Sequence, residues 1–181
     1  MNGEAAPELQ IKTWLNTAEP LTLASLRGRV VFAVAFQMLC PGCVSEGLPQ
    51  AQRARAIFPE NDLAVIGLHT VFEHHEAQGT EAALKAFLHE YRIGFPVGID
   101  MPNPDYPLPK TMQAYGMRGT PTTLLFDRRG RLRVHHFGHL DDMQIGAAIA
   151  TLIENGRAAL DGEAAPSGED GARCAADGTC R

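Results

Sequence analysis

The 181-residue sequence has little of what marks several large protein classes. It contains no apolar run near the roughly 20 residues that a membrane-spanning helix needs. Its four cysteines are too few to hold a small scaffold together by disulfides. A net charge of −5, without a stripe of Lys and Arg, argues against general nucleic-acid binding. An apolar content of 45% and a charged content of 20% instead predict a soluble globular domain.

The N-terminal residues carry no targeting signal that can be recognised in the sequence. Met1–Pro7 has neither the basic segment nor the apolar segment of a secretory leader. We therefore expect a cytoplasmic protein without a membrane partner. In a reducing compartment, a C-x-x-C motif is more often catalytic or metal-binding than structural.

The most informative motif is Cys40-Pro41-Gly42-Cys43, which directly follows the apolar run Val30–Phe36. Residues from Val44 onward have a helical pattern, so the motif joins a buried strand to a helix. Unpaired N–H groups and the helix dipole at such a position stabilise a thiolate. We expect the pKa of Cys40 to lie below the usual value of about 8.5, with Cys43 one turn later as its partner.

The residues around this motif suit the same chemistry. Pro41 takes an early helical position where a missing N–H costs nothing, and Gly42 adds no bulk beside the sulfur. Glu46 follows Cys43 by three residues and could pass protons to it on a shared helical face. A solvated glutamate that merely suits the helix dipole explains Glu46 equally well.

The order of apolar patterns predicts an α/β domain over residues 1–156. A leading strand within Leu9–Leu15 precedes two buried strands, a hairpin with its turn at Asp127–Gly130, and helices between them. Other local signals are Pro49 as a helix kink, Thr80 and either Asp141 or Asp142 as N-caps, and Asn155-Gly156 as the end of the last helix. Residues 157–181 lose the apolar periodicity and predict a flexible tail that holds Cys174 and Cys180.

Three motifs together resemble the thioredoxin-like superfamily, and in particular its TlpA-like branch bordering on the AhpC/TSA redoxins. They are the C-x-x-C after a central strand, the run Gly119–Thr123 with its Thr-Pro pair, and the turn Asp127–Gly130. The resemblance covers about residues 9–155 and implies a thioredoxin-like fold with a helical insertion around residues 71–109. It also implies that the bond between Thr120 and Pro121 is cis and that the Thr120 backbone faces the dithiol, where an extended substrate segment can pair.

By this resemblance the protein is a thiol–disulfide oxidoreductase with an antioxidant role. Cys40 is the nucleophile and Cys43 resolves the mixed disulfide, so the redox-active disulfide replaces any cofactor. Substrates are disulfide-containing proteins or small thiols, and an unidentified thiol supplies electrons. Departures from thioredoxin are Val34 in place of a buried acid, Leu39 in place of a tryptophan, and Pro49 one position later than the family's helix proline.

Other functions remain open from the sequence. In a peroxiredoxin-type peroxidase, Cys43 would be the peroxidatic sulfur. In a redox-sensing or metal-handling module, Cys174 and Cys180 would act as a switch, whereas in an enzyme they would relay electrons or form an incidental pair. The adjacent histidine pairs have poor geometry for joint ligation, so no metal site is expected.

Overall fold

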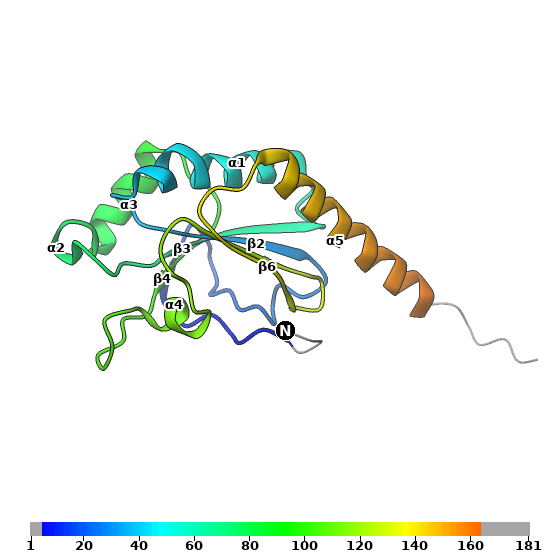
Figure 1. Cartoon of the computed structure of the whole chain (residues 1–181), viewed down its shortest axis with the longest axis horizontal. Coiled ribbons are helices and arrows are strands. Elements are labelled where there is room, and N and C mark those ends of the chain that lie inside the picture. Colours follow the sequence, from blue (N-terminus) through cyan, green and yellow to red (C-terminus); the bar gives the residue numbers. More distant parts are fainter. Residues whose placement is uncertain (1–4, 164–181) are drawn as a thin grey trace, which may run out of the picture.

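The computed structural model describes residues 5–163, which form a six-stranded mixed sheet flanked by helices (Figure 1). The order of strands across the sheet is β1-β4-β3-β2-β5-β6. Their bounds are Ile11–Leu15 for β1, Val30–Phe36 for β2, Leu63–His69 for β3, Val97–Asp100 for β4, Thr122–Phe126 for β5 and Leu132–Phe137 for β6. This arrangement confirms the predicted α/β class and the predicted late hairpin.

The two central strands pair in parallel over their whole length. β2 and β3 are in register from Val30 opposite Leu63 to Phe36 opposite His69, and every residue in both strands is buried. β5 pairs antiparallel with the other side of β2. Continuous apolar character is expected of strands covered on both faces. Because parallel strands end at the same edge, the segments that follow Phe36 and His69 lie next to each other.

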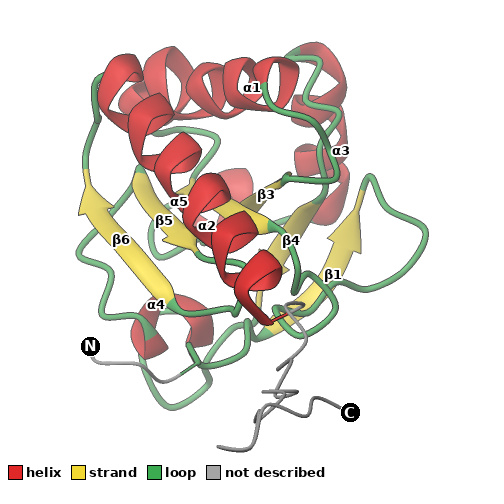
Figure 2. Cartoon of the chain, turned by 90° about the vertical axis from the view of Figure 1, so that its right-hand side faces the viewer, coloured by secondary structure: helices red, strands yellow, loops and turns green. Residues whose placement is uncertain are grey.

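Helices cover both faces of this sheet. The helices α1 (Leu48–Ile57), α3 (Glu81–Glu90) and α5 (Asp142–Glu163) lie on one face, and α4 (Lys110–Ala114) lies on the other (Figures 1 and 2). Two apolar clusters correspond to these layers: Phe32 and Phe36 pack among the first group, whereas Val31 and Phe126 pack with α4. In the part of the chain that the structure describes, no helix combines the length and the hydropathy needed to cross a membrane.

The predicted cap of α3 is present. The hydroxyl oxygen of Thr80 accepts a hydrogen bond of 3.2 Å from the backbone N–H of Ala83. Thr80→Ala should lower the free energy of unfolding by about 1 kcal/mol, since one N–H at the helix start loses its partner. Urea denaturation measures this loss. Thr151→Ala, at an exposed site inside α5, serves as the control, and an equal loss there would contradict the capping role.

Pro49 does not simply kink a regular helix. The first helix contains a π-helical turn, η1 (Cys43–Gly47), which leads into α1 with Pro49 in its first turn. Leu48 donates its N–H to the carbonyl of Cys43, five residues earlier, and Pro49 has no N–H to continue the series. The wider turn thus lies between the dithiol and the proline, where a regular α-helix had been expected.

The prediction that Asn155-Gly156 ends the last helix is wrong, because α5 continues to Glu163. Asp141 caps its start, since its carboxylate accepts from the N–H of Met143 at 2.9 Å. The aliphatic stem of Arg128 packs against Gly156 where a Cβ would collide. Arg157, one residue later, forms an ion pair with Asp62 at 2.6 Å. These contacts stabilise the continuation of α5 beyond Gly156.

Candidate active site

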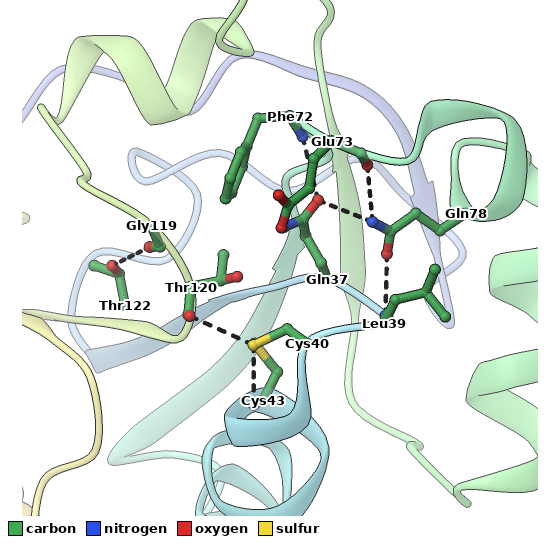
Figure 3. The surroundings of a disulfide bond; sticks show 10 residues. All are labelled: Gln37, Leu39, Cys40, Cys43, Phe72, Glu73, Gln78, Gly119, Thr120 and Thr122. Atoms are coloured by element: carbon green, nitrogen blue, oxygen red, sulfur yellow. Dashed lines mark hydrogen bonds between the residues drawn. A yellow bond between two sulfur atoms is a disulfide. The ribbon is translucent and has the colours of Figure 1, made fainter.

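Cys40 and Cys43 lie together where β2 gives way to the first helix. They are joined by a disulfide, with their Cα atoms 5.2 Å apart (Figure 3). The backbone N–H of Cys43 donates to the sulfur of Cys40 at 3.2 Å. An N–H directed at this sulfur also stabilises the negative charge of a thiolate after reduction. The Cys43 N–H is thus placed to stabilise negative charge on the Cys40 sulfur.

The two sulfurs differ in accessibility. Cys43 is completely buried, at 0% exposed, and belongs to the apolar cluster beneath α1. Cys40 is only partly buried and lies at the edge of the same cluster. A substrate approaching from solvent therefore meets Cys40 first, while Cys43 is placed to attack from within.

The Thr120–Pro121 peptide bond is cis and faces the dithiol, as the family resemblance implies. The Cys40 sulfur lies 3.4 Å from the carbonyl oxygen of Thr120, to which a reduced thiol can donate (Figure 3). Pro121 packs closely over the helix start. A Cβ at Gly42 would come within 3.4 Å of the Pro121 ring, and one at Gly47 within 3.1 Å. Gly47, which the sequence analysis did not single out, thus permits this close approach.

Glu46 has a different environment from the one expected. Its carboxylate is about half exposed and lies 4.0 Å from Nδ1 of His139, with which it pairs when the imidazole is protonated. Cys43, by contrast, points into the core. The π-helical geometry changes which residues share a face, so spacing alone does not place Glu46 beside Cys43. Its role in proton transfer remains a prediction.

His69 ends β3 at the same sheet edge as the dithiol. Its side chain is 2% exposed, and its ring lies 5.3 Å from that of Phe36 between centroids. Burial lowers the pKa of His69 from 6.5 to about 4, because the interior disfavours the charged form. A neutral imidazole buried against an aromatic ring indicates a structural role for His69.

Two buried glutamines near the dithiol were missed in the sequence analysis. Gln37 and Gln78 each have 1% of their surface exposed and bond to one another (Figure 3). The position of Gln37, a polar residue directly after the seven-residue apolar strand β2, could have indicated that its side chain has a specific partner. No local pattern marks Gln78. The predicted auxiliary pair, Cys174 and Cys180, lies outside the described residues.

Comparison with known families agrees with this arrangement. The sequence model of the AhpC/TSA family matches residues 2–135, which include the dithiol and the cis proline. The chain belongs to the AhpC/TSA family. Among solved structures, the thioredoxin-like superfamily protein SPOA0173 is 62% identical, with a TM-score of 0.81 over 83% of this chain and 97% of that one. The thioredoxin-like fold predicted from the motifs is therefore confirmed.

Other relatives of this AhpC/TSA chain have names that refer to thiol chemistry. A thiol-disulfide isomerase from Corynebacterium glutamicum is 44% identical, with a TM-score of 0.80 over 84% of this chain and 98% of that chain. ResA of Halalkalibacterium halodurans, named a thiol-disulfide oxidoreductase, is 25% identical over 70% of this chain. Protein DipZ of Mycobacterium tuberculosis is 32% identical over 84% of it. The matched region spans 64% of ResA and 21% of DipZ.

Proposed function

We propose that this protein is a thiol–disulfide oxidoreductase that acts through a mixed disulfide at Cys40. The observation that carries the proposal is the asymmetry of the dithiol. The accessible sulfur of Cys40 receives the Cys43 N–H and lies beside the Thr120 carbonyl, whereas Cys43 is buried behind it. An exposed, stabilised thiolate with a second thiol in reach is what disulfide exchange requires.

Exchange proceeds in two balanced steps. The Cys40 thiolate attacks a substrate disulfide, forming a bond to one substrate sulfur and releasing the other as a thiolate. Cys43, as its thiolate, then attacks the Cys40 sulfur, which releases the second substrate thiolate and forms the Cys40–Cys43 disulfide. Both released thiolates take protons from solvent. The substrate has gained two electrons, and an external dithiol restores the enzyme by the reverse exchange.

The further parts of this proposal follow from the same chemistry. The dithiol carries both electrons, so the reaction needs no additional cofactor. Disulfide-containing proteins are the proposed substrates, and a thiol reductant is the proposed donor. The cytoplasmic location expected from the N-terminal residues stays a prediction, as does an antioxidant role.

Reduction of insulin by dithiothreitol tests this function. Wild-type protein should accelerate precipitation of the reduced insulin chains, and Cys40→Ser should leave only the uncatalysed rate. Hydrogen peroxide consumption is measured in parallel on both proteins and on Cys43→Ser. Consumption that survives Cys40→Ser but is lost in Cys43→Ser would instead establish the peroxidase, although the complete burial of Cys43 disfavours it.

A further inference from the structure

The turn that presents Cys40 is held by more than its own backbone. After β2 ends at Phe36, the N–H of Cys40 donates to the carbonyl of Gln37 at 3.2 Å, which closes a four-residue turn. Within this turn, Leu39 has 56% of its surface exposed next to the nucleophile. The conformation of the turn therefore sets both the position of Cys40 and the surface that a partner meets beside it.

The Gln37 and Gln78 side chains, named here the glutamine bridge, fix this turn from behind. Nε2 of Gln78 donates to Oε1 of Gln37 at 3.0 Å, and Oε1 of Gln78 accepts the backbone N–H of Leu39 at 3.1 Å (Figure 3). Both side chains are almost wholly buried. A buried amide that loses its hydrogen-bond partner is strongly unfavourable, so this geometry is strongly specified.

The same bridge holds the segment of residues 72–78, which includes α2 (His75–Gln78). Oε1 of Gln37 accepts the N–H of Phe72 at 3.3 Å, and Nε2 of Gln78 donates to the carbonyl of Glu73 at 2.9 Å. Nε2 of Gln37 also reaches the Glu73 carboxylate at 3.3 Å. Gln78 is the buried residue of α2, whereas positions 73–77 are all exposed. The position of this segment therefore depends on hydrogen bonds to the turn that precedes Cys40.

We propose that the glutamine bridge positions segment 72–78 as one side of a binding site for protein substrates. This inference rests on the proposed oxidoreductase function and adds to it the surface that contacts a protein substrate beside the dithiol. An extended protein segment with a disulfide at Cys40 would contact Leu39 and segment 72–78 on one side and the Thr120 backbone on the other. A small disulfide fills only the space at the sulfur and does not use segment 72–78.

The substitution Gln78→Met tests the bridge, because it retains the length of the side chain and removes its hydrogen bonds. With insulin as substrate, KM should rise about tenfold, which corresponds to the loss of roughly one hydrogen bond of positioning energy. With the small disulfide 5,5′-dithiobis(2-nitrobenzoate), kcat/KM should remain within about twofold of the wild-type value, because the Cys40–Gln37 backbone hydrogen bond and the Cys43 N–H still hold the Cys40 sulfur in the variant. Gln144→Met, exposed on α5, is the matched control and should change neither substrate.

An unchanged ratio of the two substrates in folded Gln78→Met would overturn the inference. Wild-type protein that reduces neither substrate would instead refute the proposed function. A measurement that needs no change at Gln78 is hydrogen exchange on Cys43→Ser trapped by reaction of its Cys40 thiolate with disulfide-bonded insulin or with glutathione disulfide, each of which releases one thiolate as the mixed disulfide forms. Segment 72–78 should be protected in the first adduct and not in the second, and equal exchange in both would also refute the proposed binding site.

Discussion

Cys43→Ser should accumulate a mixed disulfide between Cys40 and a substrate protein, whereas Cys40→Ser should form none. The reason is the division of accessibility between the sulfurs: Cys40 is reached from solvent, and Cys43 is fully buried behind it. Without Cys43, release depends on an external thiol. Because a positioned intramolecular group has a very high effective concentration, turnover should fall on the order of a thousandfold. A band on a non-reducing gel that dithiothreitol removes reports the adduct.

The reciprocal pair of variants makes this experiment decisive. Ser45→Ala, at an exposed position two residues after Cys43, controls for substitution on the same helix and should retain wild-type turnover. Formation of an adduct with Cys40→Ser would show that Cys40 is not the nucleophile. The same conclusion would follow if Cys43→Ser formed no adduct under conditions where the wild-type protein turns over. Mass spectrometry of the trapped peptide identifies which sulfur carries the substrate.

Acid should destabilise the fold through His69 as the pH falls from 6.5 toward 4. Burial lowers the pKa of His69 from 6.5 to about 4, so the unfolded chain takes up a proton in a range where the folded protein does not. Its contribution to stability is complete above pH 6.5 and falls as the pH decreases toward 4. The free energy of unfolding should drop by about 3 kcal/mol over this window. Urea denaturation at pH 7 and pH 4.5 measures most of the change.

Comparison with His69→Leu isolates this effect, since all other titrating groups are common to both proteins. The variant should lose much less stability than wild type between the two pH values. His89→Leu, at an exposed position on α3, should keep the wild-type dependence. Equal losses in wild type and His69→Leu would show that another group causes the acid sensitivity.

The parts of the fold that depend on local signals were predictable. The apolar run Val30–Phe36, the cap at Thr80 and the placement of Cys40 between strand and helix need only a few adjacent residues for their recognition. The Thr120–Pro121 bond required the family resemblance, because an isolated X–Pro pair does not reveal its isomer.

The incorrect or missing predictions concern contacts between distant residues. Gln78 lies 41 residues from Gln37, and neither sequence window shows that two amides will meet in the interior. Gly156 was taken as a helix end because glycine weakens helices locally, but the packing of Arg128 and the Arg157–Asp62 ion pair override that preference. The proton-transfer role of Glu46 is not one of these: it stays a prediction, although the π-helical turn alters the regular helical spacing from which it was made.

The length of α5 restricts how the C-terminal cysteines can meet the dithiol. Gln50, on the helix that follows the dithiol, donates a hydrogen bond to Asp142 at the start of α5. The N-terminal end of α5 is therefore held against the helix that carries the dithiol. The 22 residues of α5 span about 33 Å and end beyond the Arg157–Asp62 ion pair. Cys174 follows Glu163 by 174 − 163 = 11 residues, a tether of at most about 36–40 Å when drawn straight. Cys174 could therefore approach the dithiol of its own molecule only with the intervening residues almost fully extended, a requirement that Cys180, six residues farther along the chain, does not share.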